Sequence, residues 1–216
     1  MKAVVTGGSS GIGRATVLEL AHRGVWVYDL SRHTGVDVRD AATVQSAYDL
    51  MTEPPELLVA SAGIIAPHHV EFPYNEDAEW DDVMATNVRG AYIVAKEHAR
   101  RLIEAGRPGK ILLLGSPSGR RPSLPNLAYG VSKAAVHALG LGLAQGLEPH
   151  GIKVYVLSPS HVDTPMLRSR GFNDLDDHAL LTAEATAVQI ANLLLEPNSL
   201  DGQVIYMGRE VTMKQR

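Results

Sequence analysis

Short apolar runs alternate with longer amphipathic segments along the chain. The short runs are rich in β-branched residues and are continuously apolar, as in strands buried on both faces of a sheet. The segments between them repeat apolar residues at helical spacing. Strands are predicted over residues 2–6, 25–30, 56–60, 110–114, 152–157 and 203–207, and helices over 11–22, 41–51, 79–104, 128–147 and 183–195. This alternation predicts an α/β fold with a doubly wound, Rossmann-like parallel sheet.

One link in the chain departs from this alternation. Only residues 31–36 separate the second strand from a further short strand predicted at Asp37 and Val38. Parallel neighbours are usually joined by a dozen or more residues. We therefore expect extended coil there, with the helix between strands two and three missing and the third strand short or frayed. No repeat or low-complexity linker interrupts residues 1–216, so we predict a single domain.

Composition and charge remove several classes of function. The chain has 20 Lys+Arg against 24 Asp+Glu, and this balance favours neither nucleic acid nor an anionic membrane. It has no Cys, which excludes disulfides, thiolate metal sites and a cysteine nucleophile. The longest apolar stretch, residues 57–66, is shorter than the roughly 18 residues that span a bilayer. Residues 3–7 are too few for a secretory signal, so we expect a cytoplasmic protein.

A glycine- and serine-rich turn joins the first strand to the first helix. Glycines permit positive φ and close backbone approach, and the N-terminus of a helix attracts phosphate. The turn therefore predicts a pyrophosphate cradle, although a plain strand-to-helix turn is the alternative and the glycine spacing differs from the usual dinucleotide fingerprint. The candidate cofactor contacts in this turn are Gly7, Ser9, Ser10, Gly11, Ile12 and Gly13.

Three polar side chains are predicted to converge at the carboxyl edge of the sheet. Tyr129 and Lys133 are four residues apart on one helix, which places phenol and amine on the same face. Taken alone, a tyrosine and a lysine at this spacing are more often a surface pair than a catalytic one. Ser116 follows the strand at 110–114, however, and lies at the edge where open α/β sheets bind ligands. A phenol and an amine are both groups that can act in general acid/base catalysis, so their convergence with a hydroxyl marks a candidate site.

In order along the chain, these motifs resemble the classical short-chain dehydrogenase/reductase family. Residues 6–13 are similar to its Thr-Gly-x-x-x-Gly-x-Gly turn, Asn87 lies in an Asn-Val-x-Gly context, and Tyr129 and Lys133 match Tyr-x-x-x-Lys with Ser116 at the family's spacing. The resemblance implies hydride transfer between a nicotinamide cofactor and a carbonyl or alcohol. Tyr129 would be the general acid/base, with its pKa of about 10 lowered by Lys133.

The resemblance also assigns the remaining roles in this tetrad. Lys133 would bond the nicotinamide ribose, Ser116 would polarise the substrate oxygen, and Asn87 would hold a water that links Lys133 to solvent. A helix-interior side chain bonded to a neighbouring carbonyl is the alternative for Asn87. Asp37 and Val38 would approach the adenine. Further implied cofactor contacts are Ala60, Ala62, Gly63, Tyr129, Lys133, Pro159, Val162 and Thr164.

Several positions depart from the family pattern. Ala60-Ser61-Ala62-Gly63 stands where the family usually has Asn-Asn-Ala-Gly, which changes support on the adenosine side. Ser160 replaces a glycine, and Gly208-Arg209 replaces paired glycines, so the floor under the nicotinamide is expected to differ. No catalytic group is lost.

Cofactor choice depends on the end of the second strand. An acidic side chain there favours NAD, whereas Ser31 followed by Arg32 resembles an NADP-preferring pattern, because Arg32 can pair with a 2′-phosphate. NADP is therefore preferred. NAD stays open, because Asp29 could bond the ribose if the strand ended two residues early, and Ser10 lacks a basic charge.

The chain also offers a candidate metal site and a candidate lid. His68, His69 and Glu71 are close in sequence, but no further His closes a metal site, so no metal is predicted. Residues 165–182 are predicted to form a mobile lid over the substrate. Arg168 and Arg170 in this segment could either bind an anionic group of the substrate or be solvated, and the second interpretation is favoured. A small apolar carbonyl substrate is therefore favoured over a keto acid.

Small residues in the helices at 79–104 and 128–147, including Ala134, Ala138 and Gly142, permit close helix packing. The family resemblance places a subunit interface there and implies a homodimer or homotetramer. Two other function classes stay open: a dinucleotide-binding sensor or scaffold without turnover, and an epimerase or dehydratase that uses the cofactor transiently.

Overall fold

A single parallel sheet forms the centre of the molecule. The computed structural model describes residues 1–66, 76–169 and 180–208. Within these ranges the strand order is β2-β1-β3-β4-β5-β6, and every pairing is parallel. The strands are β1 (Lys2–Thr6), β2 (Trp26–Leu30), β3 (Leu57–Ala60), β4 (Gly109–Leu114), β5 (Ile152–Pro159) and β6 (Val204–Met207). The six short apolar runs predicted as strands therefore all form strands.

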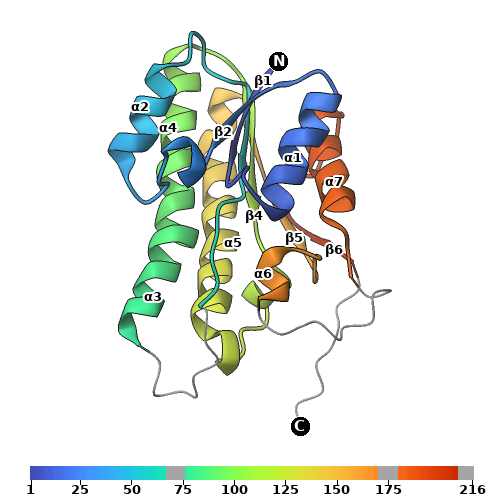
Figure 1. The fold of residues 1–216 in the computed structure, drawn as a ribbon. Helices are drawn as coiled ribbons and strands as arrows, with labels where there is room; N and C mark the ends of the chain where they lie inside the picture. Colours follow the sequence, from blue (N-terminus) through green and yellow to red (C-terminus); the bar gives the residue numbers. More distant parts are fainter. Residues whose placement is uncertain (67–75, 170–179, 209–216) are drawn as a thin grey trace.

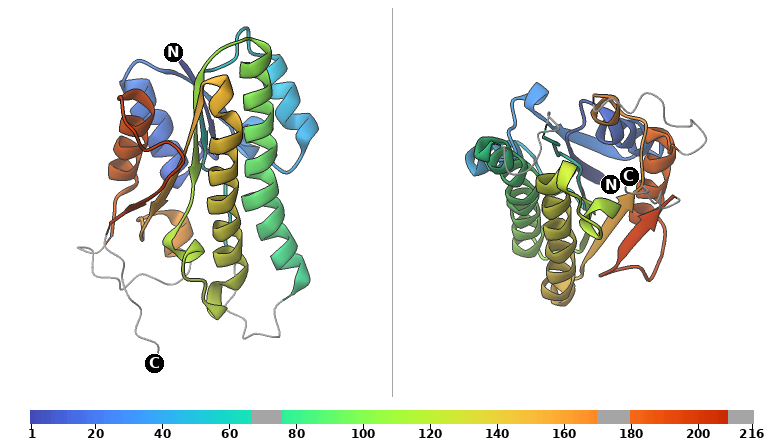
Figure 2. Two further views of the ribbon diagram at one scale, coloured as in Figure 1. Left: turned by 180° about the vertical axis from the view of Figure 1, so that it is seen from behind. Right: turned by 90° about the horizontal axis from the view of Figure 1, so that it is seen from below.

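Helices cover both faces of this sheet, which confirms the doubly wound architecture (Figure 1, Figure 2). On one face lie α1 (Gly11–His22) and α7 (Ala183–Leu195), and on the other lie α2 (Ala41–Asp49), α4 (Ala91–Glu104) and α5 (Leu127–Leu147). The helix predicted over 79–104 is a continuous run of α3 (Asp77–Met84), a π-helical segment (Ala85–Gly90) and α4. A short helix, α6 (Pro165–Arg168), follows β5 at the carboxyl edge.

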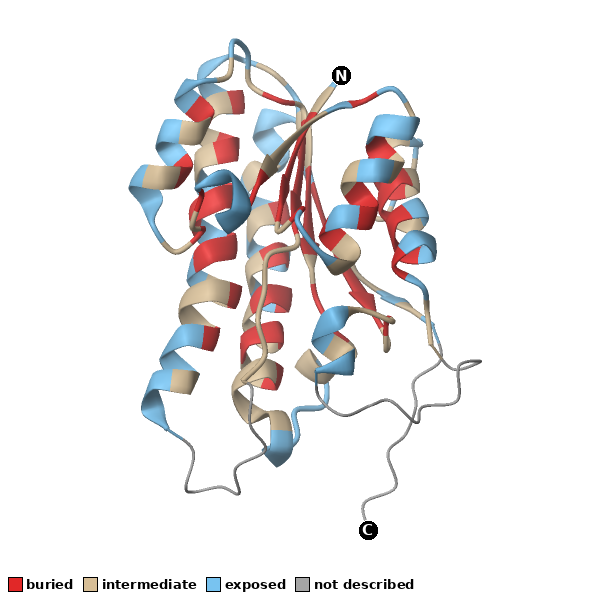
Figure 3. Ribbon diagram, in the orientation of Figure 1, coloured by how far each residue is buried: buried red, intermediate tan, exposed pale blue. Residues whose placement is uncertain are grey.

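The core has two apolar layers because alternate strand residues point to opposite faces. In β1, Val4 packs in the layer under α2, α4 and α5, whereas Ala3 and Val5 pack in the layer under α1 and α7. Buried positions are concentrated on the strands and on the helix faces turned toward them (Figure 3). This double burial fixes the sheet as a rigid platform for the loops at its carboxyl edge.

The outer strands are less buried than the apolar runs predicted. β2 and β6 each pair with one neighbour in the described sheet, and Trp26 is 66% exposed. The expectation that every strand is buried on both faces is therefore wrong for these two, because helices and neighbouring strands cover the sheet edges incompletely.

The link from β2 to β3 spans residues 31–56 and contains α2. Residues 31–36 hold no α-helix, as predicted, but they form a 3-10 turn at Arg32–Thr34 where extended coil was expected. Asp37 and Val38, however, pair with no strand of the described sheet, so the prediction of a short third strand is wrong. The Asp37 carboxylate accepts the N–H of Arg39 at 2.9 Å and turns the backbone, while Val38 packs against Gly90. The chain then continues directly into α2 and β3.

One helical stretch, Leu124–His150, is long and apolar enough to cross a membrane by the measures of length and composition, over 27 residues. The helix α5 forms most of this stretch and packs along β5. At Gly140 the two elements are so close that a Cβ would lie 2.2 Å from the Val156 side chain. A core helix of a folded domain passes the same test, and α5 is buried in part against the sheet.

Candidate active site

A cavity of about 720 Å³ opens at the carboxyl ends of the strands. The strand order reverses between β1 and β3, and such a switch point is where open α/β sheets bind their ligands. Segments that follow β1 to β5 all contribute to the wall. The predicted site residues among its lining are Gly7, Ser9, Ser10, Gly11, Ile12, Gly13, Ser31, Arg32, Asp37, Val38, Ala62, Gly63, Ser116, Tyr129, Lys133, Pro159, Val162 and Thr164.

The glycine-rich turn at one end of the cavity requires its glycines. Gly7 and Gly11 have φ of 69° and 51°, in the left-handed region that side chains disfavour. A Cβ on Gly13 would lie 2.2 Å from the carbonyl oxygen of Gly7. Ser10 precedes α1 without a side-chain cap bond in the described structure, and Ser10 and the first residues of the helix line the cavity. This geometry suits a phosphate-bearing ligand.

The end of β2 places Ser31 and Arg32 in the wall of the cavity. The strand extends through Leu30, so it does not end two residues early. Asp29 lies within it, and its carboxylate accepts the N–H of Gly8 at 3.0 Å and the hydroxyl of Ser31 at 3.2 Å. Asp29 therefore braces the glycine-rich turn against β2, and it is absent from the described cavity lining.

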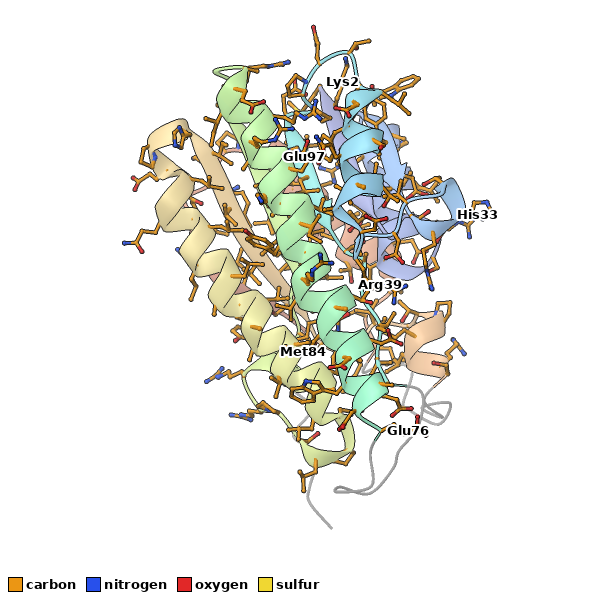
Figure 4. The ribbon with its side chains drawn as sticks, turned by 90° about the vertical axis from the view of Figure 1, so that its left-hand side faces the viewer. Lys2, His33, Arg39, Glu76, Met84 and Glu97 are labelled. Atoms are coloured by element: carbon orange, nitrogen blue, oxygen red, sulfur yellow. The ribbon has the colours of Figure 1, made fainter. Side chains whose placement is uncertain are left out.

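Next to this position, Arg39 (labelled in Figure 4) forms ion pairs with Asp37 and Asp82, and all three residues line the cavity. Arg39 donates to both carboxylate oxygens of Asp37 at 2.7–3.0 Å and to Asp82 on α3 at 3.2 Å. The bond from Arg39 lowers the pKa of Asp37 below its ordinary value. Sequence reasoning found Asp37 but missed Arg39 and Asp82, because only the fold brings α3 to the loop that follows β2.

The hydroxyl, phenol and amine converge as predicted from the sequence. The Lys133 Nζ lies 5.6 Å from the centroid of the Tyr129 ring and donates to the carbonyl of Leu114 at 2.7 Å. Ser116, after β4, hydrogen-bonds the Tyr129 phenol. The loop after β4 and the helix α5 thus bring three groups able to move protons to a single wall of the cavity.

Burial shifts both titrating groups of this cluster. It lowers the pKa of Lys133 to about 8. It also raises the pKa of Tyr129, and the hydrogen bond from Ser116 opposes this rise only in part. The expected lowering of the Tyr129 pKa by Lys133 is not seen, because the amine is directed to the Leu114 carbonyl and desolvation of the phenol dominates.

Asn87 lies in the π-helical segment, behind the cavity wall. Its side chain is 1% exposed, accepts the N–H of Ile64 at 2.8 Å, and donates to the Ile64 carbonyl and to Ser132 Oγ at 2.9 Å each. It thereby ties the loop after β3 to α5. A π-helical turn offsets the helix register at this point and is frequent at functional sites. Asn87 is absent from the described cavity lining, so its contacts fit the alternative of a side chain bonded to neighbouring carbonyl groups.

Comparison with known proteins identifies the family. A model described as short chain dehydrogenase matches residues 1–174. The chain belongs to the short-chain dehydrogenase/reductase family.

Individual relatives and solved structures are similar over most of their length. A galactitol 2-dehydrogenase of Rhizobium johnstonii is 34% identical over 77% of this chain and 73% of its own. An uncharacterized oxidoreductase of Staphylococcus epidermidis is 31% identical over 92% of this chain and 93% of its own. A 3-ketoacyl-(acyl-carrier-protein) reductase of Brucella melitensis, complexed with NADH, shares the fold at a TM-score of 0.87 and 24% identity, over 96% of each chain. Fold and family thus agree with the sequence motifs.

Where the chain departs from the usual short-chain dehydrogenase/reductase pattern after β3, a serine joins two strands. Ser61 Oγ donates to the Thr6 carbonyl at 2.5 Å, and the Ala62 N–H donates to Thr6 Oγ1 at 3.0 Å. Ser61 therefore braces the glycine-rich turn, and it lines the cavity although it was not predicted to do so. Ala60 is 6% exposed within β3 and is absent from the described lining.

The segment after β5 also differs from the family pattern. Ser160 Oγ is buried and has no hydrogen-bond partner among the described residues, and a Cβ on Gly208 would lie 2.3 Å from it. Thr164 caps α6 through the N–H of Leu167 at 3.3 Å. Ser160 and Thr164 both line the cavity. Arg209, which follows Gly208, lies outside the described residues.

The described part of the predicted lid holds one of its two arginines. Arg168 donates twice to the Asp163 carboxylate, at 2.6 Å each, so its charge is paired within the segment. Residues 170–179, including Arg170, lie outside the described ranges, as do His68, His69 and Glu71. Among the remaining residues no cluster of three His, Cys, Asp or Glu groups is arranged to hold a metal.

Sequence reasoning missed a set of lining residues that carry no motif. They lie next to predicted residues, or come from the π-helical segment and the loop after Ser116, and only tertiary contacts bring them to the wall. They include Leu30, Val36, Ile64, Ile65, Thr86, Leu114, Ser118, Arg121, Asn126 and His161.

Proposed function

We propose that this short-chain oxidoreductase transfers a hydride between a nicotinamide cofactor and a carbonyl or alcohol substrate, with Tyr129 as general acid/base. The observation that carries the proposal is the convergence of Ser116, Tyr129 and Lys133 on the cavity wall reached by the phosphate-binding turn. Hydride donation or acceptance is the chemistry that the nicotinamide supplies when bound. The proton must then be moved by the protein.

Each polar group has a separate task in moving that proton. Tyr129, protonated because burial raises its pKa, donates its proton to the developing alkoxide in the direction of reduction. Ser116 has one O–H, which bonds the phenol in the structure and would turn to the same substrate oxygen when substrate binds. Lys133, on the same wall, stabilises the tyrosinate that remains, because its positive charge lies 5.6 Å from the ring centroid.

The cavity fits a dinucleotide along its length. The glycine-rich turn and the N-terminus of α1 would hold the pyrophosphate, and Ser31 and Arg32 would face the ribose on the adenine side. Thr164 and Val162 would border the nicotinamide, with Lys133 near its ribose. These assignments follow the family's motifs residue by residue.

NADP is the preferred cofactor in this proposal. Asp29 is engaged by Gly8 and Ser31, and Arg32 offers a guanidinium at the position next to the ribose. Arg32→Ala should weaken NADPH binding about tenfold or more and leave NADH binding nearly unchanged, as for loss of one charge-assisted contact. Nicotinamide fluorescence titration measures both affinities. Equal affinities of the wild-type protein for the two cofactors, unchanged by the variant, would contradict this choice.

Catalysis is tested by Tyr129→Phe. The variant should bind cofactor with near wild-type affinity and lose turnover by at least about a hundredfold, the lower end for removal of a general acid/base. Turnover is followed by NADPH absorbance with a panel of small ketones, quinones and steroids, in which small apolar carbonyl compounds are expected to react before keto acids. Unchanged turnover in this variant would refute the mechanism.

The same measurements separate the alternatives. A sensor or scaffold would bind cofactor and turn over no member of the panel. An epimerase or dehydratase would convert substrate without net consumption of NADPH. The three groups held together at the cavity favour the oxidoreductase, since a binding protein has no need of an acid/base pair.

A further inference from the structure

Behind the cavity wall, two buried polar side chains form a pair that the proposed proton transfer does not use. His137 is 9% exposed and Ser158 is fully buried, and the His137 Nε2 lies 2.9 Å from Ser158 Oγ. Neither residue is among the described lining of the cavity. They cannot act by touching a ligand there, so any role in the reaction must pass through other residues.

The pair is placed by the same helix that carries the proposed acid/base. Tyr129, Lys133 and His137 follow one another at intervals of four residues on α5, so they share the face turned toward the sheet. Ser158 lies near the end of β5, where α5 approaches closely. The two side chains therefore meet between helix and sheet, one helical turn below Lys133.

This pair fills the space that a side chain at position 115 would occupy. A Cβ built on Gly115 would lie 2.3 Å from Ser158 Oγ and 2.7 Å from His137 Nε2. The Gly115 N–H donates to the Leu157 carbonyl at 2.7 Å, which extends the ladder between β4 and β5 by one residue. The position of this backbone is thus fixed from one side by the sheet and from the other by the pair.

Gly115 connects two groups of the proposed mechanism. The carbonyl of Leu114, just before it, accepts the hydrogen bond from Lys133, and Ser116, just after it, bonds the Tyr129 phenol. A shift of the Gly115 backbone would move both partners at once. The direction of the Lys133 amine and that of the Tyr129 phenol therefore depend on the same short segment.

The surroundings keep the imidazole neutral. Burial, together with the positive charge of Lys133, lowers the pKa of His137. The ring of Tyr206 on β6 packs edge-on against the imidazole, with 6.1 Å between the two ring centroids. The Arg120 guanidinium lies 5.7 Å from the centroid of the Tyr206 ring. A neutral imidazole can serve Ser158 as a hydrogen-bond partner without placing a second positive charge beside Lys133.

From these contacts we propose that His137, acting through Ser158, is a positioning residue that fixes the Leu114–Gly115–Ser116 segment for the proton transfer. The kinetic part of this inference rests on the proposed function. The structural part, that the pair holds Gly115, stands without it.

The first experiment measures hydrogen exchange at the Gly115 amide in the full-length protein without substrate. His137→Leu and Ser158→Ala should each speed this exchange about five- to tenfold, the factor for one lost hydrogen bond. The double variant should be no faster than either single one, because both remove the same interaction. His137→Gln, whose amide can again reach Ser158, should restore slow exchange.

The matched control is His98→Leu. His98 is also a buried histidine, 1% exposed, and its Nδ1 lies 3.0 Å from the Tyr48 hydroxyl, but it lies between α4 and α2 and away from Gly115. Its replacement should lower thermal stability and leave Gly115 exchange relative to neighbouring amides unchanged. This control separates a local effect at Gly115 from general destabilisation.

The second experiment measures kcat and KM with the panel compound that the wild-type protein reduces fastest. His137→Leu and Ser158→Ala should lower kcat about five- to tenfold with KM and the cofactor Kd within twofold, and His137→Gln should recover most of the loss. Unchanged Gly115 exchange and kcat in both single variants would overturn the inference, as would an equal effect of His98→Leu. If the wild-type protein reduces no compound, the proposed function fails, whereas the exchange data still decide whether the pair holds Gly115.

Discussion

Lys133 should destabilise the folded protein near neutral pH while it serves the active site. The residue is 5% exposed, and burial lowers its pKa from 10.5 to about 8. At about 1.4 kcal/mol for each pH unit, keeping this amine protonated in the folded chain costs about 3 kcal/mol. Replacement by Met, which keeps the length of the side chain and removes the charge, should therefore stabilise the fold.

The net gain is smaller than this cost because Lys133 also makes a bond. Its Nζ donates to the Leu114 carbonyl at 2.7 Å, and the loss of that hydrogen bond takes back about 1 kcal/mol. Lys133→Met should thus raise the free energy of unfolding by about 2 kcal/mol at pH 7. Activity should fall at the same time, as expected for a strained functional site.

The pH dependence identifies the cause of this gain. Between pH 8 and 10.5 the unfolded chain binds the Lys133 proton and the folded chain does not, so the stability of the wild-type protein rises with pH across that window. The cost is fully present below pH 8 and disappears above pH 10.5. The advantage of Lys133→Met should therefore be lost by about pH 10.

Urea unfolding of both proteins at pH 7 and pH 10 measures these quantities. Lys96→Met, at an exposed lysine of α4, is the control for loss of a surface charge and should show no comparable gain. If Lys133→Met is no more stable than the wild type at pH 7, or if its advantage persists undiminished at pH 10, the reasoning from burial is wrong.

Two further predictions concern the turn and the assembly. Gly13→Ala should abolish cofactor binding measured by nicotinamide fluorescence, because the new Cβ would lie 2.2 Å from the Gly7 carbonyl oxygen. In the control variant Gly142→Ala the new Cβ would have no atom within 4 Å, so this variant should bind cofactor normally. Equal cofactor binding by the two variants would contradict the packing argument. The protein should form a homodimer or homotetramer through α4 and α5, on which Tyr92 and Leu141 are each 47% exposed. Light scattering that gives only the 23.2 kDa monomer at micromolar concentration would refute this.

Local sequence determined the elements of this fold, because strand and helix formation depends on short-range periodicity. Continuous apolar runs predicted all six strands, and the bounds of β1, α1 and α7 agree with the prediction. The glycine-rich turn also follows from sequence, since positive φ at Gly7 and Gly11 is a local property of the backbone. The motif Tyr129 to Lys133 needed only the spacing of one helix.

Tertiary structure decided what depends on contacts between distant segments. The pattern at Asp37 and Val38 suggested a strand, but strand formation requires a neighbour, and the Arg39 bond and the packing on Gly90 turn the chain away. The exposure of β2 and β6 follows from their places at the edges of the sheet, which no local pattern records.

The electrostatics of the site likewise belong to the fold. From the sequence we expect Lys133 to lower the Tyr129 pKa. In the structure burial raises the Tyr129 pKa, and the Lys133 amine donates to the Leu114 carbonyl. The contact of His137 with Ser158 joins residues 21 positions apart through the approach of α5 to β5. Desolvation and long-range hydrogen bonds depend on everything packed around a group, so the sequence identified the reactive side chains and only the folded chain determined their environment.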